Sequence, residues 1–234
     1  MALTGNLLLD GLTCPDLKSS ILQLARPVAF MAGKPFAEEG VVPNDLYFLT
    51  SGVASSRLRL QDGSSCEVEM VGREGLIGFR ALLGPNPSVG SHVMQTDGNA
   101  LKVPLSCLRR VFSDSEEFRQ QVLHLDFCQA QILAQLTACG LKHETGKRIA
   151  RWLLMMCDRL HSDFVRVTQE DLGERLSVMR STVSVVTGNL EKAGMIHTRR
   201  GTITILDRPA LAAHCCECYA ICRAFADAIY PEPC

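Results

Sequence analysis

The strongest constraint on the fold comes from residues 167–196, VTQEDLGERLSVMRSTVSVVTGNLEKAGMI, in which two amphipathic segments flank three residues. The first segment starts at Thr168, whose hydroxyl can cap a helix, and acidic residues follow at the positive end of the helix dipole. The second segment runs from Arg180 to Ala193, and Gly194 is a typical helix stop. Because residues 177–179 leave room only for a sharp turn, the stretch predicts a helix-turn-helix.

The second helix of this motif is the element expected to contact DNA. In a helix-turn-helix, that helix enters the major groove and its N-terminal residues reach base edges. Arginine is the commonest reader of guanine, and serine and threonine serve bases or phosphates. The alternative is a helical hairpin with a solvated polar face. The residues predicted to contact DNA are Arg180, Ser181, Thr182, Ser184 and Val185 in the second helix, Thr168 and Gln169 at the start of the first helix, and Arg199 and Arg200 at the tip of a hairpin predicted for HTRRGTITIL.

Charge supports a nucleic-acid role only locally. The net charge of the 234-residue chain is −1, so the chain as a whole is not a polycation. Between Arg148 and Arg208, however, ten lysines and arginines outnumber seven acidic residues. The sequence shows no glycine-rich phosphate loop, nucleophile elbow or metalloprotease motif, so it does not indicate an enzyme.

The sequence has the features of a cytoplasmic protein. A membrane helix needs roughly 18 or more consecutive apolar residues, and no run approaches that length. The N-terminal MALTGNLLLDGLTC has no basic region before its short apolar run, which is not typical of a secretory signal. We therefore expect a cytoplasmic location, in which the eleven cysteines are reduced thiols rather than a disulfide framework.

Residues 27–111 have the pattern of an all-β unit. Short apolar runs alternate with turn signals at a spacing of about eight to twelve residues, which is typical of a barrel or a sandwich. The segments RLRL and CEVEM, on either side of QDGSS, alternate apolar and polar residues and predict a hairpin. A short helical lead-in is expected before this unit, within residues 1–26.

The longest helical signal covers residues 113–140. Ser113 or Ser115 can cap its start, and Glu116 and Glu117 suit its first turn. Apolar residues recur along it at helical spacing and form a narrow seam, which would pack either against a copy of the same helix or on its own β unit. The seam residues are Phe118, Val122, Leu125, Ile132, Leu136 and Cys139.

These segments together resemble the Crp/Fnr family of bacterial transcription regulators over nearly the whole chain. The C-terminal VTQEDLGERLSV, STVS, LEKAGMI and RRGTITILD carry most of the resemblance, and EEG, YFLTSG, QDGSS and GREGLIG are consistent with it. The resemblance implies an α+β fold: a β-roll sensor domain (a double-stranded β-helix, as in cyclic-nucleotide-binding domains) in residues 1–112, a long dimerisation helix in residues 113–145, and a winged helix-turn-helix domain with a C-terminal helix in residues 146–234. It also implies a homodimer that binds near-palindromic promoter DNA, with RNA polymerase as a further partner.

The resemblance does not extend to the residues that hold a cyclic nucleotide. Family members that bind one carry a Gly-Glu pair for the ribose and then an Arg-Ser or Arg-Thr pair for the phosphate. The corresponding segment here is IGFRALLGPNPSVGS, in which Phe79 replaces the glutamate and residues 87–89 occupy the arginine region. A buried phosphate without a cationic partner loses a charge-assisted hydrogen bond, so cyclic AMP is not the expected effector and no cofactor is predicted. A roll without any ligand is the alternative; the candidate effector contacts are Gly78, Phe79, Arg80 and Ser88.

The recognition helix also departs from the family. Members that read a GTGA-type half-site place Arg, Glu and Arg along this helix, where this chain has Arg180, Ser181 and Val185. We therefore expect DNA binding with a different consensus, in which Val185 can contact a thymine methyl group.

The C-terminal segment is rich in cysteine. A final helix is predicted to open at Asp207, and Cys215, Cys218 and Cys222 would share one of its faces. Thiolates on one face can hold a metal or a cluster or respond to oxidation, which makes a thiol-based redox or metal sensor the alternative function. Three ligands from one straight helix fit a closed tetrahedral site poorly, and reduced cysteine is also a good core residue. Oxygen-sensing members of the family use cysteines near the N-terminus, where this chain has only Cys14.

Overall fold

The structure, a computed structural model, describes residues 3–84, 87–88 and 90–229. Val89, which falls in the predicted effector region, lies outside these residues. The chain divides into two units. The first contains the chain up to Arg57, then Glu69–Ala130 and the chain from Phe225, and the second contains Leu58–Val68 and Gln131–Ala224. No helix in the described part of the chain is both long and apolar enough to cross a membrane.

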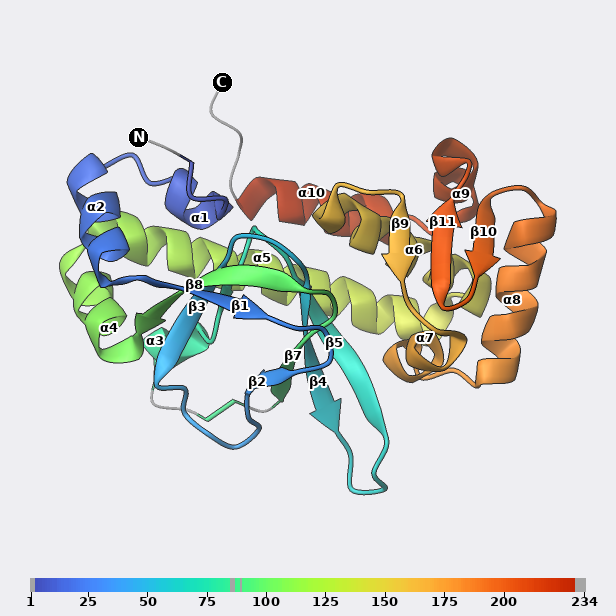
Figure 1. Ribbon diagram of the computed structural model, residues 1–234, viewed down its shortest axis with the longest axis horizontal. Helices are drawn as coiled ribbons and strands as arrows, with labels where there is room; N and C mark the ends of the chain where they lie inside the picture. Colours follow the sequence, from blue (N-terminus) through green and yellow to red (C-terminus); the bar gives the residue numbers. More distant parts are fainter. Residues whose placement is uncertain (1–2, 85–86, 89, 230–234) are drawn as a thin grey trace. The chain divides into compact units, whose positions relative to one another are not determined.

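Two four-stranded sheets form the centre of the first unit (Figure 1). The strand order in one sheet is β1 (Arg26–Phe30), β8 (Gly98–Pro104), β3 (Asp45–Leu49) and β6 (Leu76–Ile77). The order in the other is β2 (Pro35–Ala37), β7 (Ser91–Met94), β4 (Ala54–Arg59) and β5 (Ser65–Val71). The neighbouring pairs β1–β8, β3–β8 and β4–β7 are antiparallel. The apolar faces of these strands enclose a core, which confirms the predicted β-roll; its buried members are Leu49, Ala54, Val71, Ile77, Met94 and Ala100.

The predicted hairpin is the ribbon of β4 and β5. Leu60 donates its backbone N–H to the carbonyl of Ser64 at 2.8 Å, and Gly63 takes a positive φ of 84° in the turn. The outer part of the ribbon belongs to the second unit, where Glu67 accepts hydrogen bonds from Trp152 Nε1 at 2.8 Å and from Arg175 Nη1 at 3.1 Å. The Glu67–Arg175 ion pair is almost fully buried, so both charges depend on each other for solvation.

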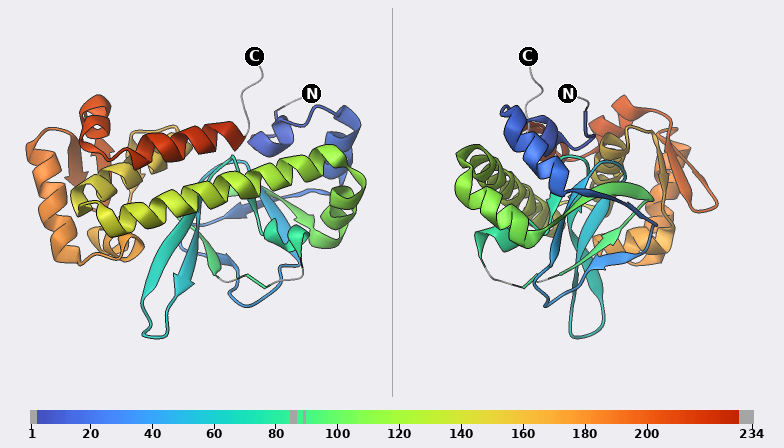
Figure 2. Two further views of the ribbon diagram at one scale, coloured as in Figure 1. Left: turned by 180° about the vertical axis from the view of Figure 1, so that it is seen from behind. Right: turned by 60° about the vertical axis from the view of Figure 1, so that its left-hand side comes forward.

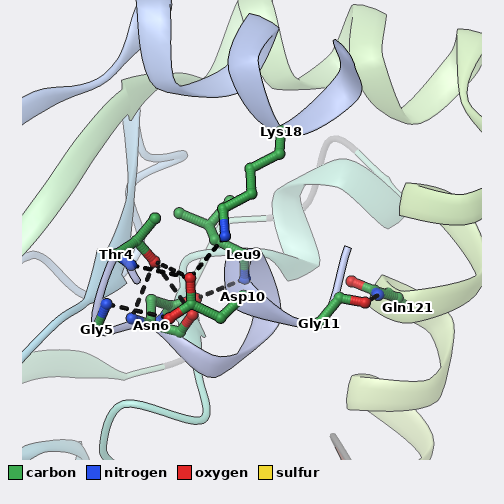
Figure 3. A network of polar contacts seen from close by, with 8 residues as sticks. All are labelled: Thr4, Gly5, Asn6, Leu9, Asp10, Gly11, Lys18 and Gln121. Atoms are coloured by element: carbon green, nitrogen blue, oxygen red, sulfur yellow. Dashed lines mark hydrogen bonds and ion pairs between the residues drawn. The ribbon is translucent and has the colours of Figure 1, made fainter. Parts of the chain in front are cut away.

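Polar contacts hold the N-terminal segment together and anchor it to the roll; Figure 3 shows those within the segment, among them the Asp10–Lys18 pair. Two helices, α1 (Leu7–Asp10) and α2 (Pro15–Leu24), form the predicted helical lead-in. Asn6 is fully buried before α1 and its side-chain amide donates to three backbone carbonyls, those of Leu49, Arg73 and Gly75. Lys18 reaches back from α2 and forms a 2.8 Å ion pair with Asp10. These bonds satisfy polar groups that burial would otherwise leave unpaired.

The long helix, α5 (Glu116–Lys142), follows α4 (Leu105–Asp114) directly. Ser115 caps its start, because the Ser115 hydroxyl accepts a hydrogen bond from the Phe118 backbone at 3.2 Å. Of the predicted seam residues, Phe118, Val122 and Leu125 are fully buried in the first unit, and Cys139 is fully buried in the second. These four side chains therefore pack within the protomer, whereas the other two predicted seam residues, Ile132 and Leu136, are half-buried. The large apolar side chains that α5 leaves exposed are Leu123, Phe127, Leu133 and Leu141.

The second unit carries the helices and the small sheet predicted from the sequence (Figures 1 and 2). Its helices include α6 (Thr145–Leu160), α7 (Gln169–Leu176) and α8 (Arg180–Lys192). Its three-stranded sheet has the order β10 (Ile196–Arg199), β11 (Thr202–Ile205) and β9 (Phe164–Arg166). Residues 177–179 are the only link between α7 and α8, as the spacing predicted. Together with the roll and α5, this gives the α+β architecture expected from the sequence.

The prediction of one continuous C-terminal helix is wrong. Asp207 caps the start of α9 (Arg208–His214) as expected, since its carboxylate accepts a hydrogen bond from the Ala210 backbone at 2.9 Å. The helix then stops, and α10 (Cys218–Ile229) begins only after an interruption at residues 215–217. Cys215 takes extended backbone angles at this break. The three candidate cysteines of this segment therefore do not share one helix face.

Candidate nucleic-acid interface

The turn between α7 and α8 depends on a close approach of backbones. Ser177 takes a left-handed conformation with a φ of 52°, which redirects the chain within three residues. A Cβ atom on Gly173 would lie 2.7 Å from the carbonyl oxygen of Val178, closer than a carbon and an oxygen can pack. Glycine at this position therefore allows the turn to fold against α7.

A capping box fixes the start of α7. The Thr168 hydroxyl accepts a hydrogen bond from the Asp171 backbone at 3.0 Å, and the Asp171 carboxylate accepts one from the Thr168 backbone at 3.2 Å. Next to this cap, the Val167 N–H donates to the carbonyl of Gly201 at 2.9 Å. The predicted DNA contacts Thr168, which is exposed, and Gln169, which is half-buried, therefore lie close to the tip of the β10–β11 hairpin.

The N-terminal half of α8 presents a polar face to solvent. Its buried face consists of Val183, Thr187 and Leu190, and the Thr187 hydroxyl donates to the Val183 carbonyl inside the helix. Met179 precedes the helix without a side-chain cap, so the first backbone N–H groups stay available to an anion. The predicted contacts on this helix all retain solvent access: Arg180, Ser181, Ser184 and Val185 are exposed and Thr182 is half-buried.

The wing is a tight hairpin that carries two arginines. Arg199 pairs with Thr202, so only Arg200 and Gly201 form the loop between β10 and β11. Both have positive φ, 44° and 75°, as a two-residue hairpin loop with type I′ geometry requires. The side chains of Arg199 and Arg200 are exposed at this tip, as the sequence predicted.

Glu191 is a positioning residue that the sequence did not reveal. It lies near the C-terminal end of α8, where the helix dipole disfavours a carboxylate. Its carboxylate accepts hydrogen bonds from the Thr198 backbone at 3.0 Å and the Thr198 hydroxyl at 2.7 Å, and it contacts His197 Nδ1 at 2.8 Å. These bonds lower the pKa of Glu191, the backbone bond most strongly. They tie α8 to β10, beside which it lies in Figure 1, and an acidic residue at an unfavourable helix end was the available signal.

The candidate effector contacts line a cavity inside the first unit. Its volume is about 710 Å³, and all four predicted contacts, Gly78, Phe79, Arg80 and Ser88, are on its wall. Phe79 is buried at the start of the short helix α3 (Arg80–Leu83). Aromatic and aliphatic side chains supply much of the remaining wall, among them Phe36, Tyr47, Val71, Ile77 and Leu76. The composition is that of a site for a small organic molecule.

The cation on the described wall of this cavity is already paired. Arg80 is the only arginine or lysine among the described residues that line it. Its guanidinium forms ion pairs with Asp126 at 3.0 Å and Glu69 at 3.6 Å, and lies 4.9 Å from the centre of the Phe79 ring. Burial, with the nearby Arg80 charge, lowers the pKa of His92 to about 4, so that this side chain is a neutral imidazole at physiological pH. An entering anion would find no unpaired cation on the described part of this wall.

Of the three C-terminal cysteines named as redox or metal candidates, only Cys218 belongs to the group of close metal-ligand atoms among the described residues. Burial raises the pKa of Cys215 to about 12 and that of Cys222 to about 11, so both thiols are protonated and weakly nucleophilic near neutral pH. Cys218 instead contacts two residues near the end of α5, with Gln135 Nε2 at 3.1 Å and His143 Nδ1 at 3.4 Å from its sulfur.

Two family models match the chain, one over the β-roll and one over the region with the helix-turn-helix. A cyclic nucleotide-binding domain model matches residues 27–115, and a Crp-like helix-turn-helix domain model matches residues 147–214. The sequence has no match among the curated proteins.

Solved structures share the fold along most of the chain. TTHB099, a CRP-family transcriptional regulator from Thermus thermophilus, has a TM-score of 0.69 and 23% identity over 80% of this chain and 95% of its own. A protein from Eubacterium rectale assigned to the Crp/Fnr family has a TM-score of 0.72 and 15% identity over 91% of this chain and 99% of its own. The c-di-GMP-responsive regulator CLP from Xanthomonas campestris has a TM-score of 0.68 and 14% identity over 82% of this chain and 99% of its own. The nucleotide-binding model matches the β-roll, and the Crp-like model matches the region with the exposed recognition helix. Because both occur in one chain, this protein is a member of the Crp/Fnr family of DNA-binding transcription regulators.

Proposed function

We propose that this chain is a homodimeric regulator that binds specific, near-palindromic promoter sites and acts on transcription through RNA polymerase. In this proposal, residues 1–112 sense a signal, residues 113–145 hold the dimer together, and residues 146–234 read DNA. The observation that carries it is the exposed face of α8, where Arg180, Ser181, Ser184 and Val185 lie in the same unit as a wing that carries Arg199 and Arg200.

The recognition face suggests how the bases are read. Arg180, in the first turn of α8, is the residue suited to the O6 and N7 atoms of a guanine. Ser181 and Ser184 can bond to bases or phosphates, and the exposed Val185 can contact a thymine methyl group. No acidic residue lies on this part of the helix to accept a bond from cytosine. The expected half-site therefore combines a guanine with thymines.

The exposed row on α5 supports the homodimer. Leu123, Phe127 and Leu141 are exposed and belong to one row with heptad spacing along α5. The positions of this row between Phe127 and Leu141 are occupied by small residues, Ala130, Ala134 and Thr137. Leu133 lies beside this row and is also exposed. A row with this register, left uncovered along a long helix, is what a second copy of the helix packs on. Two helix-turn-helix domains related by a two-fold axis would then reach half-sites about one helical turn apart.

The effector is proposed to be a neutral or largely apolar molecule rather than cyclic AMP. A cyclic phosphate in the cavity would have to take Arg80 from Asp126 and Glu69, and two carboxylates would stay close to the bound anion. Phe79 fills the position where the family's glutamate holds a ribose, as the sequence suggested. The similarly folded CLP is described as responsive to c-di-GMP, so the fold itself does not prescribe cyclic AMP.

Regulation then follows from a shift between populations of the dimer. An effector bound in the roll changes DNA affinity only as far as it binds one arrangement of the recognition helices better than another. Arg80 is a candidate for reporting occupancy, because it lies on the cavity wall and contacts Asp126 and Gln129 of α5.

Selection of genomic DNA fragments by the purified full-length protein, at near-physiological salt, tests the proposed function. Enrichment of an inverted repeat with a guanine in each half-site is the expected result. Retention of DNA only at low salt, without a shared sequence, would contradict it, because unspecific binding rests on phosphate contacts that salt weakens.

Calorimetric titration of the protein with cyclic AMP tests the proposed effector class. We expect no binding, and saturable binding would overturn the assignment of the effector.

A further inference from the structure

Four potential metal ligands meet inside the second unit. They are Cys139 in the last turn of α5, His143 just after it, Cys216 in the break before α10, and Cys218 at the start of α10. Their ligand atoms all lie within 4.8 Å of one another. The sulfurs of Cys139 and Cys216 are 3.6 Å apart, and the Cys218 sulfur is 3.4 Å from His143 Nδ1. The break in the C-terminal helix, which separates Cys215 from Cys222, brings these four together.

The size of the group matches the coordination shell of one tetrahedral ion. A Zn–S bond of about 2.3 Å gives a tetrahedron with an edge of about 3.8 Å, close to the two contact distances observed. An iron–sulfur cluster distributes its cysteine ligands over several irons and so holds the cysteine sulfurs further apart. Three sulfurs and one imidazole nitrogen also form a donor set typical of structural zinc sites.

The fold builds the site from two separate segments. Cys139 and His143 are four residues apart, and the His143 N–H donates to the Cys139 carbonyl at 3.0 Å, so both side chains lie on one face at the end of α5. Cys139, Cys216 and Cys218 are buried, with 0%, 5% and 0% of their surface exposed, and together form a core cluster of their own. Because the fourth ligand is also partly covered, the site leaves little room for a substrate, which is the pattern of a structural rather than a catalytic ion.

The contacts around the four ligands are those that orient metal ligands. His143 turns Nδ1 toward Cys218, and its Nε2 lies 3.3 Å from the Glu217 carboxylate. A carboxylate on the far nitrogen fixes the tautomer of a ligating histidine. Gln135 donates an N–H to the Cys218 sulfur at 3.1 Å, a bond that a thiolate accepts better than a thiol.

The charge of a nearby arginine fits an occupied site. Three thiolates and one divalent cation leave a net charge of −1. Arg151 is 6% exposed, acts electrostatically on Cys139, and has no ion pair with a carboxylate in the described part of the chain. A buried guanidinium without a counter-charge is costly, and an anionic metal centre would supply that charge.

We propose that Cys139, His143, Cys216 and Cys218 bind one Zn²⁺ ion per chain, which joins the start of α10 to the end of α5. Each thiol releases its proton to solvent as its sulfur binds the ion, and no electron is transferred. None of the four ligands is among the residues proposed to contact DNA, so this proposal can fail while the proposed function stands.

Metal analysis of the full-length protein, purified under reducing conditions without chelator, is the first test. We expect about one Zn²⁺ per chain, and thiolate-to-metal charge-transfer absorption after replacement by Co²⁺. Cys139→Ala and Cys216→Ala should lose the ion, whereas Cys157→Ala, which removes an equally buried cysteine of α6, should keep it. Three results would overturn the proposal. They are wild-type protein that binds no metal after reconstitution, the absorption of an iron–sulfur cluster, and a Cys139–Cys216 disulfide as the resting state.

A surface variant tests the site without disturbing the core. The Glu217 side chain is 66% exposed, so Glu217→Gln should fold normally. Loss of an outer carboxylate typically weakens metal binding by about 10- to 100-fold, and competition with a coloured chelator would measure that change. Unchanged affinity in Glu217→Gln would contradict the role given to the His143–Glu217 contact.

Discussion

At the scale of single residues, the proposed DNA-reading surface depends on residues that shape the backbone as well as on its exposed arginines. Gly173 lets the turn close against α7, and Arg200 and Gly201 let the wing reverse in two residues. Glu191 ties the wing to α8 through Thr198. These residues fix the backbone that carries the exposed arginines.

Replacement of Arg180 by alanine is expected to remove most of the sequence preference. A bidentate arginine–guanine contact contributes about 1–3 kcal/mol of discrimination, so affinity for a selected site should fall by that amount and affinity for random DNA much less. Fluorescence anisotropy with both DNAs measures the difference. Lys192→Ala, at the other end of α8, is the control. Equal weakening on both DNAs would mean that Arg180 binds phosphate instead of a base.

Replacement of Gly173 by alanine is expected to destabilise the second unit. The added methyl group would lie 2.7 Å from the Val178 carbonyl oxygen, and overpacking of this kind costs about 1–3 kcal/mol. Gly188→Ala in α8 is the matched control, because nothing lies within 4 Å of its added Cβ atom. There the higher helix propensity of alanine should stabilise the protein by up to about 1 kcal/mol. Thermal unfolding of both variants should therefore show shifts of opposite sign.

At the scale of elements, α5 serves three purposes with different faces. Phe118, Val122 and Leu125 are buried in the first unit, and Cys139 is buried in the second. The row of Leu123, Phe127 and Leu141 remains exposed. One helix therefore contributes to two cores and still leaves apolar side chains exposed, which the proposed dimer would cover.

A glutamate on this exposed surface is expected to dissociate the dimer. Leu133 is 43% exposed, so Leu133→Glu should cost the isolated protomer little, but it would bury a charge between two copies. Analytical ultracentrifugation should show a shift of the wild-type dimer to monomer. Leu206→Glu changes an equally apolar exposed residue outside α5 and should stay dimeric. A dimer that survives Leu133→Glu would place the interface elsewhere.

At the scale of the whole molecule, the proposed sensing site and the proposed DNA-reading site belong to different units. The cavity belongs to the first unit, and the recognition helix and the wing belong to the second. The cavity has a buried neutral histidine and a paired arginine, and the proposed ligand preference and the expected response to pH both follow from these side chains.

Acid is expected to destabilise the protein through His92. The pKa of this histidine is about 4 in the folded protein and about 6.5 when unfolded, so the unfolded state binds more protons between these values. Stability should therefore fall as pH drops from about 6.5 to about 4, by about 3 kcal/mol from this group alone. Urea unfolding of His92→Gln across the same range should show a smaller loss. Parallel pH dependence of both proteins would show that His92 does not contribute.

The sequence by itself determined the features that depend on neighbouring residues. The Thr168 cap, the three-residue turn, the β10–β11 hairpin and the exposed contacts on α8 follow from hydrogen bonds and periodicities within a few positions. The family resemblance added the order of the domains, which agrees with the matches to residues 27–115 and 147–214.

Only the tertiary structure decided which surfaces meet. A helix pattern shows that α5 has apolar rows, but the fold determines which side chains are buried, and four of the six predicted seam residues pack within the protomer. Likewise, Cys139 and Cys216 are 77 positions apart, and a backbone break of three residues, invisible to helix periodicity, brings their sulfurs together. Contacts between distant segments depend on the angles at which elements pack, and those angles are set by the whole core rather than by local sequence.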